Sequence, residues 1–304
     1  MMKIKYGNQI SIDNLKDVDI DLFIFANNSE NRKYCLLDKI TENNNILRAI
    51  SLYYKETFEE KYNFVENKLI KDHSDIEDLL DQFINNCKKD ELKIIIDYSC
   101  MTKSWYYVIM LYLANKEVPL KKISCFFSYT PSKFSEPLLP KANSDISPLP
   151  GKISIPNNRP KALIVGLGYE ENKAQGIIDQ IDPAKVFLLY SKPTLDEKFT
   201  NAIETNNENV INSFKETTYT YDFSSLIDIE NKLKAIYYKY NKEYSIIISP
   251  IGPKPFTFIS MILSILYNDI EIWRIGSGED INPYPRDPFE DGKFIISEVH
   301  YENF

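Results

Sequence analysis

Short apolar runs alternate with helix-like stretches along this chain, and that alternation is the feature that most constrains its fold. In the first half the runs fall at 21–25, 93–98 and 123–127, and each is largely apolar, as strands covered on both faces are. Apolar residues recur at helical spacing from 76 to 84, and 105–113 has the composition of a mostly buried helix. Strands separated by helices predict βαβ crossovers and a mainly parallel sheet.

A proline-rich connector interrupts this pattern, which then starts again. Seven of the chain's 16 prolines lie between 130 and 160, where fixed φ angles and missing N–H donors exclude a helix or a central strand. Beyond it we expect strands at 161–165, 185–190, 244–248 and 270–274, an edge strand at 294–299, and helices at 172–181, 227–240 and 256–266. The predicted fold class is therefore α/β, with two tandem Rossmann-like units at 1–150 and 151–304.

Two blocks of sequence recur in the same order in both halves, each between a strand and a helix. They match at five positions: Glu30 with Glu170, Lys33 with Lys173, Leu37 with Ile177, Lys103 with Lys254, and Trp105 with Phe256. A tandem duplication of one unit explains why both blocks recur. The alternative is that all Rossmann-like units share the succession of strand, loop and helix, and that a glutamate and a lysine match easily.

Both blocks follow strands, which places them where open parallel sheets bind ligands. The expected contacts are Glu30, Asp97, Ser99, Thr102 and Lys103 in the first half, and Ser191, Lys192, Gly252 and Lys254 in the second. Unpaired N–H groups and the dipole at a helix start favour an anion, and a lysine adds a point charge suited to phosphate. The alternative is that the hydroxyl residues only cap the helix and that the lysines are solvated.

The second half contains loop glycines that the first half lacks. Gly166 and Gly168, followed by Tyr169, resemble part of a dinucleotide fingerprint, but Glu171 stands where its third glycine would be. No acidic residue clearly ends the next strand, so we predict neither a standard NAD site nor a cofactor. We expect these glycines to allow a tight turn and the close approach of a ligand, which favours a better-formed pocket in the second half.

Two glutamates are candidate catalytic groups if the chain is an enzyme. Glu170 follows the glycines. The alternatives to a catalytic role are that it binds a ribose hydroxyl of the ligand or is simply solvated. Glu279 lies in a loop with Ser277 and Gly278 after the last strong strand. We expect this loop to cover the site; the alternative is a flexible exit from the sheet.

Bulk properties exclude several classes of protein. A net charge of −8 argues against a protein that coats DNA. The four cysteines form no CxxC pair and the two histidines are remote from them, which predicts no metal site and free thiols in a reducing cytoplasm. The N-terminus lacks the apolar segment of a signal peptide, and the longest apolar runs are too short to span a membrane. P-loop, GxSxG and HExxH motifs are absent.

The turns Met101-Thr102-Lys103 and Gly252-Pro253-Lys254 carry a resemblance to a known family. The succession of a strand, such a turn and an apolar helix that begins at the turn resembles the CRISPR-associated Rossmann fold (CARF). SAVED domains are similar to two such units fused. The first turn departs from the family's Gly-Thr-Lys pattern by lacking glycine, and the second has proline in place of threonine. The resemblance implies sensing of cyclic or linear oligonucleotides in prokaryotic antiviral defence, as a homodimer with an effector or defence-complex protein as partner.

Three functions remain open from the sequence. The first is a regulatory protein that senses a nucleotide or oligonucleotide through Lys103 and Lys254. The second is a nucleotide-processing hydrolase, a nuclease or glycosidase-like enzyme, that uses Glu170 or Glu279. The third is a protein-interaction subunit of a defence complex, with a degenerate pocket in one or both halves.

Overall fold

The chain forms two α/β units in the computed structural model, which describes residues 2–54, 60–137, 145–152, 157–276, 286–290 and 293–303. Unit 1 consists of Met1–Lys133 together with Pro283–Phe304, and unit 2 of Phe134–Asn282. The segment that begins at Pro283 therefore completes unit 1 after the chain has passed through unit 2.

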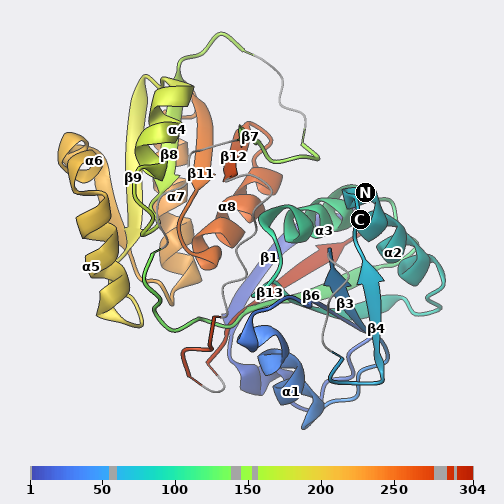
Figure 1. The fold of residues 1–304 in the computed structure, drawn as a ribbon. Coiled ribbons are helices and arrows are strands. Elements are labelled where there is room, and N and C mark those ends of the chain that lie inside the picture. The colour runs from blue at the N-terminus through green and yellow to red at the C-terminus, as the bar shows by residue number, and fades with distance from the viewer. Residues whose placement is uncertain are drawn as a thin grey trace. The chain divides into compact units, whose positions relative to one another are not determined.

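Unit 1 alternates strands and helices from β2 to β6, except that β4 follows β3 with no helix among the described residues between them, and its first and last strands join the same sheet (Figure 1). Its described strands are β1 (Lys3–Ile10), β2 (Leu22–Ala26), β3 (Ala49–Tyr53), β4 (Val65–Leu69), β5 (Glu91–Asp97), β6 (Lys122–Tyr129) and β13 (Ile295–Glu302). Its helices are α1 (Cys35–Thr41), α2 (His73–Asn85) and α3 (Lys103–Asn115), with short 3₁₀ helices η1 (Ile12–Leu15) and η2 (Asn31–Tyr34).

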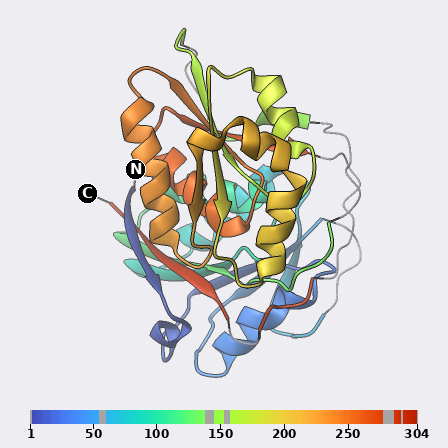
Figure 2. The same cartoon turned by 90° about the vertical axis from the view of Figure 1, so that its left-hand side faces the viewer.

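The described strands of unit 1 lie in the order β1-β13-β6-β5-β2-β3-β4. From β6 to β4 all neighbours are parallel. Strand β13 is antiparallel to both of its neighbours, β6 and β1. In Figures 1 and 2 the two terminal strands, dark blue and red, run side by side.

Unit 2 has the same alternation with its own sheet. Its described strands are β7 (Asp145–Pro148), β8 (Lys161–Gly166), β9 (Lys185–Ser191), β10 (Thr218–Tyr221), β11 (Ser245–Pro250) and β12 (Ile270–Gly276). Its helices are α4 (Lys173–Ile181), α5 (Glu197–Asn206), α6 (Glu208–Ser213), α7 (Leu226–Tyr240) and α8 (Lys254–Leu266), with the 3₁₀ helix η3 (Lys215–Thr217). The order is β10-β9-β8-β11-β12-β7, parallel except for β7.

The two sheets match strand for strand. Read from the parallel edge, β4-β3-β2-β5-β6-β13 in unit 1 corresponds to β10-β9-β8-β11-β12-β7 in unit 2, and the last strand of each series is antiparallel. The register also agrees, because Phe25 faces Asp97 in unit 1 and Val165 faces Ser249 in unit 2. The fold is thus two tandem Rossmann-like units with mainly parallel sheets flanked by helices, which confirms the predicted fold class.

The strand at the C-terminus lies elsewhere than expected. We expected an edge strand in the second unit, whereas β13 pairs between β1 and β6 of unit 1. From Ser297 onward its residues alternate between buried and partly exposed, a pattern that any half-covered sheet accepts. Backbone contacts of Lys133 with Asp287 and of Phe289 with Pro131 hold the returning chain against unit 1. The two units accordingly divide at Lys133 and Phe134, whereas the sequence predicted a boundary near 150.

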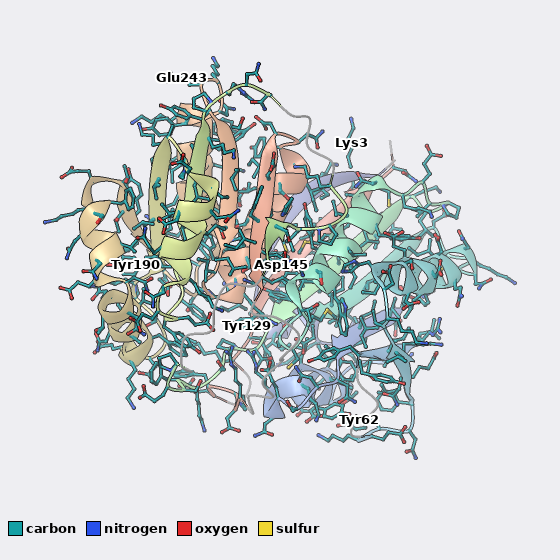
Figure 3. All side chains as sticks on the ribbon, turned by 45° about the horizontal axis from the view of Figure 1, so that its top comes forward. Lys3, Tyr62, Tyr129, Asp145, Tyr190 and Glu243 are labelled. Carbon is teal, nitrogen blue, oxygen red and sulfur yellow. The ribbon has the colours of Figure 1, made fainter. Side chains whose placement is uncertain are left out.

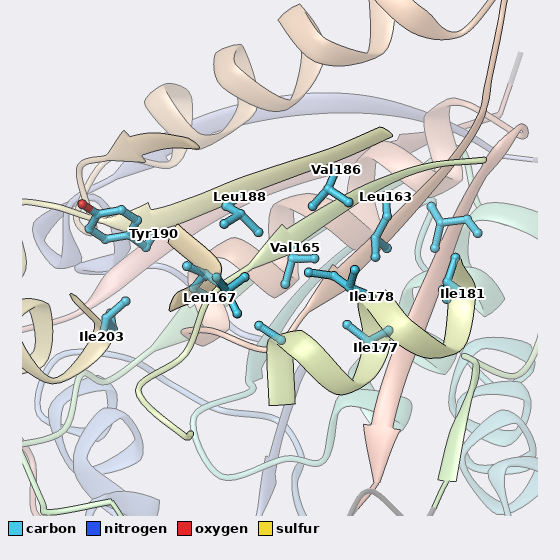
Figure 4. Packing of buried hydrophobic residues seen from close by; sticks show 13 residues of the cluster. Leu163, Val165, Leu167, Ile177, Ile178, Ile181, Val186, Leu188, Tyr190 and Ile203 are labelled. Carbon is cyan, nitrogen blue, oxygen red and sulfur yellow. The ribbon is translucent and has the colours of Figure 1, made fainter. Parts of the chain in front are cut away.

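Helices cover both faces of each sheet. In unit 1, Phe23, Phe25 and Phe126 pack with residues of α1 on one face, while α2 and α3 contact each other. In unit 2, Val165 and Leu188 pack against Ile177 of α4 (Figure 4). Phe187, the residue before Leu188, points to the other face, where its ring meets the ring of Tyr240 of α7 with 5.0 Å between centroids. No helix among the described residues has both the length and the apolar character needed to cross a bilayer.

Candidate functional site

The candidate site lies in unit 1, beyond the carboxyl ends of β2 and β5. These neighbouring parallel strands continue in opposite directions across the sheet, because β2 leads to β3 and β5 leads to β6. The two following loops therefore diverge, and a crevice at this point is where open α/β sheets bind ligands. The loops 27–34 and 98–102 contain Glu30, Ser99 and Thr102, and Asp97 ends β5, so the fold brings these predicted residues to one edge.

A buried arginine ties three loops together at this edge. Arg32 has no exposed surface, and its Nε donates to Oε2 of Glu30 at 2.7 Å. Its Nη1 donates to the Thr130 carbonyl at 2.6 Å, and its Nη2 to the Ser99 carbonyl at 3.0 Å. The guanidinium lies 5.3 Å from the ring centre of Tyr129, which Figure 3 labels. One side chain thus holds the loops that follow β2, β5 and β6.

The charge of Arg32 is maintained by its surroundings. Burial alone would lower the pKa of Arg32, but Tyr129, Cys100 and Glu30 together raise it above its usual value. The arrangement therefore keeps a permanent cation beneath the loops. Glu30 is held in turn, because Asn28 Oδ1 accepts from the Glu30 amide at 2.9 Å and Asn28 Nδ2 donates to the Cys100 carbonyl at 3.2 Å.

Asp97 and Ser99 form a second buried link. Oδ1 of Asp97 accepts from the amide of Ser99 at 3.0 Å and also from its hydroxyl. The hydroxyl oxygen of Ser99 accepts from the amide of Thr130 at 2.7 Å. Asp97 is 2% exposed and Ser99 is fully buried, so both shape the loop from beneath. Neither side chain reaches the surface to contact a ligand directly.

Helix α3 begins at the rim of this edge. Thr102 is its N-cap residue in an extended conformation, and the amide of Trp105 donates to the Thr102 carbonyl at 3.2 Å. The hydroxyls of Thr102 and Ser104 lie 3.1 Å apart. Thr102, Lys103 and Ser104 are all partly exposed, so two hydroxyls and an ammonium group surround the start of the helix. This is the part of the edge that a ligand can reach.

The matching place in unit 2 is filled by the chain itself. A Cβ added at Gly166 would lie 2.3 Å from the Phe256 ring, and one at Gly252 would lie 2.4 Å from the Leu167 carbonyl oxygen. The amide of Gly252 donates to the Gly166 carbonyl at 2.7 Å, so the loops after β8 and β11 are bonded backbone to backbone. These glycines allow the close approach of protein to protein, whereas we expected them to make room for a ligand.

The other predicted residues of unit 2 also have intramolecular contacts. The carbonyls of Gly168 and Tyr169 accept from Asn207 at 3.0 Å and from Asn206 at 2.6 Å. The Tyr169 ring lies 5.7 Å from the Phe199 ring. The loop after β8 is thereby attached to helices α5 and α6.

Two charged candidates of unit 2 are paired with oppositely charged neighbours. Glu170 meets Lys173 at 2.6 Å, and Lys192 meets Glu204 at 2.7 Å. Lys254 is the first residue of α8 and is partly exposed, whereas Ser191 is buried at the end of β9. Ser277, Gly278 and Glu279 lie outside the described residues.

The loop lengths show why the two blocks align imperfectly. Asp97 and Ser249 share a register position, yet five residues separate Asp97 from Lys103 and four separate Ser249 from Lys254. The first loop is therefore one residue longer. The sequence comparison aligned the lysines and so placed the ends of β5 and β11 one residue out of step.

Sequence reasoning missed Arg32 and Asn28 as parts of this edge, and also Tyr54, which follows β3, the parallel neighbour of β2. Arg32 is one residue before the aligned Lys33, and its only signal is a cation two positions after a glutamate in a loop that follows a buried strand. Such a pattern is common on surfaces, so only the tertiary structure reveals its burial.

No family model matches the chain, and no curated protein matches it. The solved structures that resemble it include a multidomain adenylation, ketoreductase and pseudo-Asub structure of a keto acid-selecting NRPS module, with 10% identity and a TM-score of 0.23. Another is an N-terminal ketoreductase from the macrolactin assembly line, with 9% identity and a TM-score of 0.17. Each match covers 82% of this chain, which spans 27% of the first structure and 63% of the second. Similarity at this level carries no argument about activity.

Proposed function

We propose that the chain is a nucleotide- or oligonucleotide-binding sensor, with its ligand at the carboxyl edge of unit 1. The observation that carries the proposal is the contrast between the units. Unit 1 has partly exposed Thr102, Lys103 and Ser104 above a fixed polar base, whereas Phe256 and the glycine loops fill the matching place in unit 2. A single working site per chain follows from this contrast.

The charge at this edge supports an anionic ligand. The end of β5 and the loops 27–34 and 98–103 contain Arg32, Lys33 and Lys103 against Glu30 and Asp97, three cations against two carboxylates. A third carboxylate, Asp287, meets the first loop, where it accepts from Asn31 Nδ2 at 2.6 Å, so the named groups balance in charge although the whole chain carries −8. An edge without the negative excess of the rest of the chain admits a phosphate, and amides at the start of α3 and the two hydroxyls provide hydrogen-bond donors.

The role of each group follows from its burial. Lys103 provides the charge for a phosphate, and Thr102 and Ser104 donate hydrogen bonds to its oxygens. Arg32 and Asp97 are buried and act on the ligand only by fixing the loops. The resemblance to CARF and SAVED proteins adds the setting to the proposal, which is antiviral defence with an effector protein as partner and a homodimeric assembly.

The test is isothermal titration of the purified chain with mononucleotides and with linear and cyclic oligonucleotides. Lys103→Ala should weaken binding about tenfold or more, since one charged hydrogen bond contributes about 1.5–3 kcal/mol. Lys254→Ala is the matched control, because it removes the first lysine of the corresponding helix in unit 2. Equal loss in both variants, or none in Lys103→Ala, would reject the site in unit 1.

The same samples distinguish the alternative functions. Chromatography of the titrated nucleotides after incubation detects hydrolysis, and loss of turnover in Glu170→Gln would favour the enzyme. Binding of no nucleotide, together with co-purification of a neighbouring gene product, would favour the interaction subunit. Light scattering measures whether the chain is a dimer.

A further inference from the structure

An aromatic residue stands at the third position of the helix that follows the fourth parallel strand in each unit. It is Trp105 in α3 and Phe256 in α8. In unit 2 the Phe256 ring is stacked on Tyr221 with 5.3 Å between centroids, and the two are 0% and 1% exposed. This pair is sealed inside the unit, so it is part of the core.

Trp105 also has an aromatic partner in unit 1, just after a different strand of its sheet, and this pair is less completely buried. Trp105 is 6% exposed, and its ring meets Tyr54 at 5.6 Å with an interplanar angle of 68°. Tyr54 is the first residue after β3 and is only partly buried. Because the contact is edge to face, Trp105 leaves at least one face of the Tyr54 ring uncovered, whichever of the two rings contributes its edge.

Tyr54 belongs to the same edge as the proposed binding loops. Strand β3 is the parallel neighbour of β2, so the residues that follow both strands lie at the carboxyl edge of the sheet. The pKa of Tyr54 is raised by burial, and the Glu30 carboxyl and the Cys100 thiol, which lie in the loops after β2 and β5, raise it further. The phenol therefore lies within electrostatic reach of both loops.

We propose that the face of the partly exposed Tyr54 ring that Trp105 does not cover stacks on a nucleobase of the ligand. The inference rests on the proposed function and adds to it that the site recognises a base as well as a phosphate. A tyrosine side chain has only two side-chain torsions, so it gives stacking area at a small entropic cost. Stacking of this kind accepts any base, since each has a π face.

The experiment compares ligands that differ only in their bases. Short homo-oligonucleotides of each of the four bases, and an abasic oligomer of equal length and charge, are titrated into the Trp273→Phe variant. Trp105 then provides the only tryptophan fluorescence. Base-bearing oligomers should bind at least about fivefold more tightly than the abasic one and should change the Trp105 emission.

Variants identify the ring responsible. Tyr54→Ala should remove the advantage of the base-bearing oligomers, and Tyr54→Phe should keep it. Tyr219→Ala is the control, because Tyr219 is an exposed tyrosine on β10 of unit 2. Equal binding of abasic and base-bearing oligomers, or an unchanged advantage in Tyr54→Ala, overturns the inference while the proposed function stands. Failure of every oligomer and mononucleotide to bind overturns both.

Discussion

Arg32 and Glu30 form a 2.7 Å ion pair in which the arginine side chain is fully buried and the carboxylate side chain is 16% exposed. The two residues belong to one loop, but the other nitrogens of the arginine bind carbonyls of the loops after β5 and β6. The pair therefore fixes the position of three segments that approach the same edge of the sheet. A buried cation with three acceptors resists rearrangement, which is the rigidity that a binding site needs.

Removal of this cation should destabilise unit 1. Arg32→Met leaves Glu30 and two carbonyls without their donor, at a cost of about 3 kcal/mol in the free energy of unfolding. Urea unfolding in the Trp273→Phe background, followed by the fluorescence of Trp105, measures this loss of stability. Arg48→Met, which breaks the surface pair with Glu66, is the control and should cost no more than about 1 kcal/mol. Similar losses of stability in the two variants would show that Arg32 does not hold the three loops together as its contacts indicate.

Gly166 should be intolerant of a side chain. In Gly166→Ala the new Cβ would lie 2.3 Å from the Phe256 ring, and overpacking of this kind costs about 1–3 kcal/mol. The Trp105→Phe background reports on unit 2 through Trp273. Gly276→Ala, where the closest atom would be a side-chain carbon at 3.3 Å, should cost less. Replacing the Phe256 ring in the double variant Gly166→Ala/Phe256→Leu should recover part of the lost stability. An unchanged free energy of unfolding in Gly166→Ala would contradict the packing.

Lys152 should make the stability of unit 2 depend on pH. Its ammonium group donates to the carbonyls of Ser264 in the last turn of α8, of Tyr267 just after it and of Ile270 at the start of β12, and burial lowers its pKa to about 8. Below pH 8 the amine is charged in both states, so the folded state bears the full cost of burying the charge. Between pH 8 and about 10.5 the folded state has released the proton and the unfolded state has not. Stability relative to Lys152→Met should therefore rise across this window.

Urea unfolding of the Trp105→Phe protein with and without Lys152→Met, at several pH values from 7 to 10, measures this dependence. A difference between the two proteins that stays constant or falls with increasing pH would be inconsistent with the lowered pKa. The comparison with the methionine variant cancels the ionisation of the tyrosines that both proteins share.

Ligand stoichiometry should reflect the asymmetry of the two units. Because the chain fills the crevice of unit 2 at Gly166 and Gly252, titration with a mononucleotide should saturate near one ligand per chain. Calorimetry gives this ratio directly. Two equivalent sites per chain would mean that the loops of unit 2 open, and amide hydrogen exchange at Gly252 would then be rapid.

The repeat is the part of the fold that was predictable from sequence. Runs such as 185–190 are apolar on both faces, and a covered parallel strand is the structure that this pattern requires, so β9 was expected close to its observed bounds. The matched lysines Lys103 and Lys254 also both begin helices, as predicted. Local pattern is enough here because burial on both faces and helical periodicity are encoded within each segment.

The candidate site was predictable only as a location. The loops that follow neighbouring parallel strands lie at one edge of a sheet, so Glu30 and Thr102 were expected there. This rule does not tell which side chains are buried beneath the loops. Asp97 and Ser99 were expected as contacts and lie below the surface, while Tyr54 follows a strand that the sequence did not indicate. Strand β4 alternates and is largely exposed, and it too escaped notice.

By itself the sequence determined the α/β class, the tandem repeat and the edge of the sheets where function is expected, because these depend on segments of a few residues. Only the tertiary structure decided which unit holds β13, what lies beside Gly166, and whether Arg32 is at the surface or in the core. Those outcomes depend on contacts between residues far apart in the chain, such as Arg32 with Thr130, and no local pattern encodes a partner 98 positions away.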